Sequence, residues 1–153
     1  MSDQWKYKSW NDGVNEMNVL LNGQDINSHV SEVYSPPRVA GLAPQLGLLP
    51  GMSLDLSVND PDDDKPWGFN DPNKRSKALH QMFTRRSLLL IGSPMCSSFS
   101  QIQNLNWGRM TATEVERVKE YGMKHLKFAC KLYALQHEMN LHFLHEHPDG
   151  ARS

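Results

Sequence analysis

The chain has 153 residues, of which 39% are hydrophobic and 22% are charged, and every aromatic residue type is present. This length suits one domain with a hydrophobic core and is too short for two ordinary domains, while the composition excludes a disordered chain. The formal net charge is −1 and the isoelectric point is about 6.6, so the chain lacks the basic excess typical of proteins that neutralise many nucleic-acid phosphates.

Neither a membrane segment nor a disulfide framework is expected. The longest apolar run, Leu88–Ile91, is far shorter than a membrane span, and the amino terminus lacks a basic region followed by an apolar stretch. The two cysteines, Cys96 and Cys130, form no paired spacing of the kind found in disulfide frameworks and thiolate zinc sites. These features favour an intracellular chain, cytoplasmic or nuclear, with reduced thiols.

The first elements in chain order are an arm, a strand and a weak helix. Residues 1–28 are polar and predict an N-terminal arm with one short helix, so the organised domain is expected to span residues 29–153. Val30–Tyr34 suits a short strand, which ends there because the two prolines that follow supply no amide hydrogens for a ladder. Residues 38–48 predict a weak helix, made irregular by a glycine and a proline.

The middle of the chain predicts a strand, a helix and a second strand. Met52–Leu56 has the pattern of a strand, and an acidic loop follows at residues 59–65. Asp71 before a proline is typical of a helix start, with the aspartate as the N-cap. Ser87–Ile91 is a continuous apolar run ended by a glycine, the pattern of a strand buried on both faces.

The last part of the chain predicts the longest helix and a final strand. Thr111 and Glu114 have capping-box spacing, and the strand is expected at Leu141–His145. Strands that alternate with helices predict an α/β fold, in which a mostly parallel sheet carries helices on both faces and binds ligands beyond the carboxyl ends of its strands. The apolar stripe expected to face the core, where burial would protect the Cys130 thiol, is Val115, Val118, Leu126, Ala129, Cys130 and Tyr133.

Histidines and acidic residues suggest no metal site. His145 and His147 lie two residues apart on the last strand and point to one side, but no cysteine or carboxylate spacing completes a ligand set. The aspartates after Asn59 are similar to a calcium loop, except that Lys65 stands where such a loop needs glycine, so a solvated turn is predicted. A basic stripe at helical spacing predicts a solvated face that would also suit phosphate: Arg117, Lys124, Lys127 and Lys131.

The segment after the buried apolar run carries the strongest chemical signal. Residues 92–100 have the sequence Gly-Ser-Pro-Met-Cys-Ser-Ser-Phe-Ser. This segment resembles the nucleophile loop of the cytosine-C5 DNA methyltransferases, commonly Gly-x-Pro-Pro-Cys-Gln-x-Phe-Ser, with Met95 in place of the second proline and Ser97 in place of the glutamine. A reactive thiolate suits an exposed loop at a strand end, where polar groups lower its pKa. The resemblance makes Cys96 the catalytic nucleophile and places Gly92 and Pro94 at the cofactor site.

A second motif of the same family follows the last predicted strand. The family carries Glu-Asn-Val or Glu-Asn-Pro there, and this chain has Glu146-His147-Pro148. The resemblance implies that Glu146 holds and protonates N3 of a flipped cytosine while Cys96 attacks C6. An ordinary carboxylate at a strand end is the alternative interpretation.

The cofactor motif matches the family less well. Glu32, Tyr34 and Ser35 resemble its Asp-Leu-Phe-Ser strand end, but prolines stand where the family has glycines that let the S-adenosylmethionine tail approach the backbone. The resemblance assigns Glu32, Tyr34 and Ser35 to the S-adenosylmethionine pocket. Asp55, about twenty residues further on, would bind the ribose hydroxyls. Weak or absent S-adenosylmethionine binding is therefore expected of the isolated chain.

The resemblance covers residues 30–150 and implies a minimal or truncated Rossmann-like class I methyltransferase fold. One β/α unit between Asp55 and the Cys96 strand is missing, and the family's later motifs have no counterpart. The resemblance extends to segments of retroelement-type polyproteins, so a fragment of a larger polyprotein is one interpretation. The expected function is methyl transfer from S-adenosylmethionine to cytosine C5, incomplete or inactive in this chain, with DNA as a partner. A non-catalytic interaction or structural module that keeps the fold is the alternative.

Overall fold

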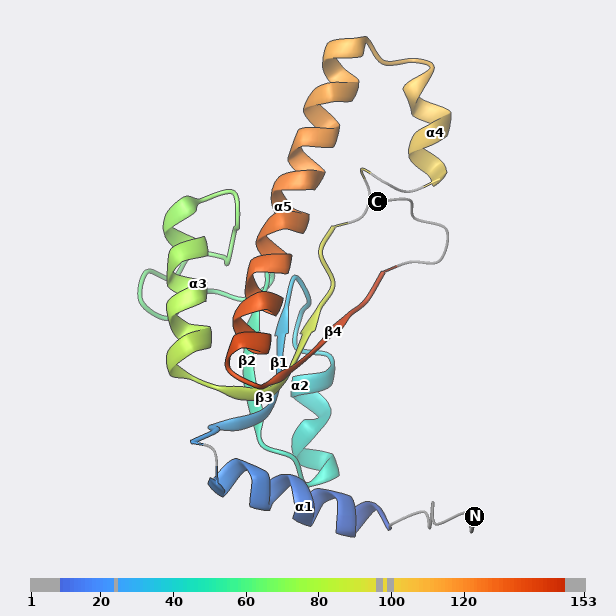
Figure 1. Ribbon diagram of the computed structural model, residues 1–153. Helices are drawn as coiled ribbons and strands as arrows, with labels where there is room; N and C mark the ends of the chain where they lie inside the picture. Colours follow the sequence, from blue (N-terminus) through green and yellow to red (C-terminus); the bar gives the residue numbers. More distant parts are fainter. Residues whose placement is uncertain (1–8, 24, 96–97, 99–100, 148–153) are drawn as a thin grey trace.

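A four-stranded sheet with helices on both faces forms the body of the computed structural model (Figure 1), which describes residues 9–23, 25–95, 98 and 101–147. All strand pairings in this sheet are parallel. The expected α/β class and parallel sheet are thus confirmed. The strands are β1 (Ser28–Val33), β2 (Pro50–Leu54), β3 (Ser87–Gly92) and β4 (His142–His145). The helices are α1 (Trp10–Gly23), α2 (Val39–Leu42), the 3₁₀ helix η1 (Ala43–Leu46), α3 (Pro72–Thr84), α4 (Gln101–Trp107) and α5 (Ala112–Glu138).

The strand order is β2-β1-β3-β4. The chain adds β2 on one side of β1 and then β3 and β4 on the other side, so the strand order reverses between β1 and β3. The helices α3 and α5 pack against each other on one face, α2 lies on the other face, and α1 runs below the amino ends of the strands (Figure 1). This arrangement is consistent with a Rossmann-like sheet, in which ligands bind beyond the carboxyl ends of the strands where the order reverses. Tyr34 follows β1 at that point, and the loop that contains Met95 follows β3.

The helix starts predicted from local signals are confirmed. The Asp71 side chain accepts a hydrogen bond from the amide of Asn73 and caps α3. Thr111 and Glu114 form both hydrogen bonds of a capping box at the start of α5. The arm contains one helix, α1, as expected, whereas α4 was not predicted.

The core lies between the sheet and the α3–α5 layer, and it corrects one prediction about α5. Val33 and Leu90 of the sheet pack there with Met82 of α3 and Leu132 of α5. The buried stripe of α5 includes Ala129 and Tyr133 as predicted, but Cys130 is exposed. The buried face of α5 centres on His125, Leu132 and Gln136, and at about 100° per residue Cys130 lies well over 90° around the helix from that centre, so it turns toward solvent.

The acidic loop is packed rather than fully solvated. Asp60 is only 1% exposed, and its carboxylate pairs with the ammonium groups of Lys74 and Lys77 on α3. Both ammonium groups also lie about 5 Å from the centre of the Trp67 ring. The loop is thereby fixed to α3, which places the following residues 67–70 at the carboxyl edge of the sheet. Among the described residues no helix is both long enough and apolar enough to cross a membrane.

Candidate functional site

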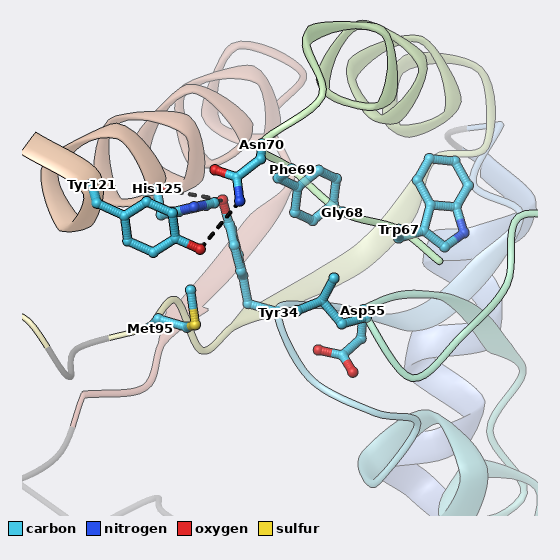
Figure 2. Close-up of a pocket in the computed structure, with 10 residues that line it drawn as sticks. Tyr34, Asp55, Trp67, Gly68, Phe69, Asn70, Met95, Tyr121 and His125 are labelled. Atoms are coloured by element: carbon cyan, nitrogen blue, oxygen red, sulfur yellow. Dashed lines mark hydrogen bonds between the residues drawn. The ribbon is translucent and has the colours of Figure 1, made fainter. Parts of the chain in front are cut away.

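A pocket opens at the carboxyl edge of the sheet, where β1 and β2 end (Figure 2). Its volume is about 240 Å³. Tyr34 directly follows β1, Asp55 directly follows β2, and Met95 lies in the loop after β3. Three loops of the sheet therefore meet at one cavity. Its lining residues are Tyr34, Asp55, Leu56, Trp67, Gly68, Phe69, Asn70, Met95, Tyr121 and His125.

Tyr34 is held at this pocket in an unusual backbone conformation. Its φ angle is +59°, in the left-handed region that bulky residues rarely adopt. The amide of Tyr34 donates to the carbonyl of Leu54, and its hydroxyl lies 2.9 Å from Nδ1 of His125. Its ring lies 4.9 Å from that of Phe69, measured between centroids. Strain of this kind persists only where the surroundings fix the residue, and it is often found at ligand sites.

Two titratable groups of the pocket favour their neutral forms. Burial raises the pKa of the Tyr34 phenol well above its ordinary value. Burial also lowers the pKa of His125, and the positive charges of Lys124 and Arg75 lower it further. A neutral phenol and a neutral imidazole next to aromatic rings suit a planar uncharged ligand better than a strongly charged one.

Asp55 supplies the carboxylate of the pocket. Its Oδ1 atom accepts hydrogen bonds from the amide and the hydroxyl of Ser57 at 2.9 and 2.7 Å. Both bonds go to one oxygen, so Oδ2 is the oxygen through which Asp55 can accept hydrogen bonds from a ligand. On the opposite side, the Asn70 amide donates to the hydroxyl of Tyr121 at 3.2 Å and joins α5 to the loop before α3 (Figure 2).

Glu32 and Ser35, which the sequence also assigned to the cofactor pocket, lie elsewhere. The carboxylate of Glu32 is buried and accepts hydrogen bonds from the amides of Val39 and Ala40 at the start of α2. The hydroxyl of Ser35 donates to the same carboxylate at 3.1 Å. Glu32 therefore caps α2 with support from Ser35, and neither residue is among those that line this pocket.

The two family-like loops lie side by side beyond β3 and β4. The hydroxyl of Ser93 donates to Oε2 of Glu146 at 2.7 Å, and the amide of Glu146 donates to the carbonyl of Gly92 at 2.8 Å. Glu146 is exposed, whereas Pro94 is buried. Cys96 lies outside the described residues, so its distance from Glu146 stays a prediction.

Gly92 has a packing role that the sequence did not reveal. A Cβ atom at this position would lie 2.0 Å from the hydroxyl of Tyr133. That hydroxyl lies 2.9 Å from Nδ1 of His145, and the Tyr133 ring stacks on Phe143. The absence of a side chain at Gly92 therefore lets α5 approach the end of β3.

The aromatic lining of the pocket was not predicted. Trp67 and Phe69 come from a loop without periodicity, and Tyr121 and His125 lie within a helix where their spacing of four predicts only a shared face. The expectation that no metal site exists stays a prediction. Among the described residues, no three His, Cys, Asp or Glu side chains are grouped in a way that could hold a metal ion.

Comparison of the chain with protein-family models, with curated proteins and with solved structures found no match.

Proposed function

We propose that the chain is a methyltransferase-like domain that binds the adenosine part of S-adenosylmethionine at the carboxyl edge of its sheet. The observation that carries this proposal is the pocket in which Tyr34 and Asp55 meet Met95, the residue before Cys96. Two of the residues assigned to the cofactor by the sequence motif thus share a cavity with the loop assigned to the nucleophile. No single motif required this arrangement.

The lining of the pocket matches the chemistry of a nucleoside. The Tyr34 and Phe69 rings offer apolar surface for a planar base, and aromatic side chains favour such offset or tilted ring contacts. The Asp55 carboxylate can accept hydrogen bonds from two ribose hydroxyls, as acidic residues do after the second strand of dinucleotide-binding folds. A ligand with one flat apolar part and a vicinal diol satisfies both groups.

The methionine tail of the cofactor has less to contact. The pocket volume of about 240 Å³ falls below the range of roughly 300–1,000 Å³ that is usual for sites of drug-sized ligands. The amides of Val39 and Ala40, which begin α2 after the proline pair, are already bonded to Glu32. The adenosine part should therefore provide most of the affinity, and the tail little.

The chemistry we assign to the neighbouring loops follows the same resemblance. Cys96 would attack C6 of cytosine as a thiolate while Glu146 protonates N3. S-adenosylmethionine held near Tyr34 and Asp55 would supply the methyl group for C5 and leave as S-adenosylhomocysteine, and loss of the C5 proton with elimination of the Cys96 thiolate would restore the ring. The hydrogen bond between Ser93 and Glu146 supports this assignment because it links the two loops. A non-catalytic module with the same fold is the alternative, and the short α2 with its occupied amides favours it.

Calorimetric titration with adenosine, S-adenosylhomocysteine and S-adenosylmethionine tests the proposal. At about −0.3 kcal/mol per non-hydrogen atom, adenosine with its roughly 19 atoms should bind with a Kd of about 0.1 mM. The other two ligands should bind within about threefold of adenosine, because their tails add few contacts. A low-micromolar Kd for S-adenosylmethionine alone would instead mean a complete cofactor site. No binding of any of the three would favour the non-catalytic module.

A variant and a ligand analogue identify the role of Asp55. Asp55→Asn should weaken adenosine binding about ten- to a hundredfold, because hydrogen bonds to charged groups contribute about 1.5–3 kcal/mol. The analogue 2′,3′-dideoxyadenosine should bind wild type and Asp55→Asn alike, since it lacks the hydroxyls. Asp25→Asn changes an exposed carboxylate outside the pocket and serves as the matched control. If dideoxyadenosine bound wild type as well as adenosine does, Asp55 would have no ribose role.

A further inference from the structure

The strand β4 forms an open edge of the sheet (Figure 1). Among the described residues it pairs with β3 only, and all four of its residues are exposed. Two of them are large and apolar, since Phe143 is 45% and Leu144 is 53% exposed. Phe143 is fixed in place by Tyr133, whose ring stacks on it at 4.7 Å between centroids. An edge that presents ordered apolar side chains is a template for another strand.

The backbone amide and carbonyl groups of β4 point alternately toward β3 and toward the open edge. The amide of Glu146 bonds to Gly92 of β3, so by alternation His142 and Leu144 also direct their polar groups toward β3. The amides and carbonyls of Phe143 and His145 then point away from β3, at the open edge. The side chains alternate as well: Tyr133 of α5 contacts both Phe143 and His145, so His142, Leu144 and Glu146 lie on the opposite face of the sheet.

Self-pairing of this edge has one register in which charges match. In an antiparallel pair the outward groups must oppose outward groups, so a two-fold axis can pass beside Phe143, Leu144 or His145 but not between neighbours. An axis at Leu144 places His142 of each copy opposite Glu146 of the other. An axis at Phe143 or at His145 leaves Glu146 without a histidine directly opposite.

We propose that β4 pairs antiparallel with β4 of a second copy of this chain, about a two-fold axis at Leu144. Phe143 of each copy then exchanges two backbone hydrogen bonds with His145 of the other copy. The two symmetric pairs give four such bonds. The two Leu144 side chains meet at the axis. The His142–Glu146 pairs flank them in directly opposed, non-hydrogen-bonded positions, where Cβ atoms approach to about 4.5–5.5 Å. The two sheets become one sheet of eight strands.

The dimer uses an oxygen of Glu146 that bonds to none of the residues that the structure describes. Oε2 of Glu146 accepts from the Ser93 hydroxyl, so Oε1 is available to His142 of the second copy. In the dimer the Glu146 carboxylate pairs with His142 of the second copy. Only the monomer can therefore use Glu146 to bind a base. The paired segment is short, and interfaces below about 1,200 Å² are weak, so the dimer should form at high protein concentration.

Sedimentation equilibrium of the full chain at pH 6 tests the pairing. The weight-average mass should rise from monomer toward dimer between about 20 μM and 1 mM, as expected for a weak interface. His142→Glu and Glu146→His should each weaken the dimer about tenfold, since each removes both symmetric pairs. The double variant His142→Glu, Glu146→His exchanges the charges and should return the Kd to within about threefold of wild type.

Two further variants make the test specific for this edge. Leu144→Lys should abolish the dimer, because it places two like charges at the axis. Phe83→Lys replaces another exposed apolar residue, on α3, and should leave the Kd unchanged. All of these side chains are exposed, so thermal unfolding monitored by circular dichroism should be the same for each variant. A monomer at every concentration, a dimer insensitive to Leu144→Lys, or a double variant that fails to recover would each overturn the proposal.

Discussion

Replacing Gly92 by alanine tests whether this glycine is required by packing. The added Cβ would lie 2.0 Å from the Tyr133 hydroxyl and 2.7 and 2.8 Å from its Cζ and Cε1 atoms, all well inside van der Waals contact. The ring can move only by losing its stack on Phe143 and the hydrogen bond to His145. Overpacking of this kind costs about 1–3 kcal/mol. For a domain of this size that corresponds to a fall in Tm of about 2–12 °C.

Differential scanning calorimetry of four variants measures this effect. Gly13→Ala is the matched control, because no atom lies within 4 Å of the added Cβ in α1, and it should raise stability by up to about 1 kcal/mol. Tyr133→Phe removes the hydroxyl that the Cβ would meet and costs about 1 kcal/mol for the lost hydrogen bond. The double variant Gly92→Ala, Tyr133→Phe should be less destabilised than the sum of its two single variants. If Gly92→Ala proved as stable as Gly13→Ala, or if the double variant were simply additive, the packing explanation would be wrong.

Local sequence signals predicted the elements of the fold well. Asp71 and Thr111 define helix starts through hydrogen bonds to amides two or three residues away, so short-range spacing was sufficient to find them. The apolar run at Ser87–Gly92 predicted a buried strand, and this strand is central in the sheet. The single helix predicted between β2 and β3 is also present, as α3. Parallel order then followed from alternating strands and helices, because short right-handed connections allow few other arrangements.

The interior of the site could not be predicted, because it depends on contacts between distant segments. The Tyr34 hydroxyl meets His125 across 91 positions of sequence, and neither residue carries a motif that indicates the other. The segment around Asp60 was predicted to be a solvated turn. Its ion-pair partners Lys74 and Lys77 lie on a helix that begins twelve residues later, so the local sequence did not reveal them. Glu32 matched a cofactor motif by type and position, yet its carboxylate is used by the first turn of α2. Residue type and spacing predicted where polar groups gather at a strand end, but not which of them line the pocket.

Two further measurements follow from groups whose surroundings differ from the sequence expectation. Cys130 is exposed, so iodoacetamide should modify it in the native protein as fast as in urea, by peptide mass mapping; modification limited by unfolding would contradict this. Burial raises the pKa of Asp60, but hydrogen bonds from Lys74 and Lys77 outweigh burial and lower it from 3.8 to about 2. Because the folded pKa lies below the unfolded one, the ion pairs stabilise the fold above about pH 4, and this contribution is lost as the pH falls toward 2. Asp60→Asn should therefore lower the free energy of unfolding by about 2–3 kcal/mol at pH 7 and by much less at pH 2, measured by urea titration, while Asp25→Asn changes neither. An equal loss at both pH values would mean that the Asp60 charge contributes nothing and that only the shape of its side chain matters.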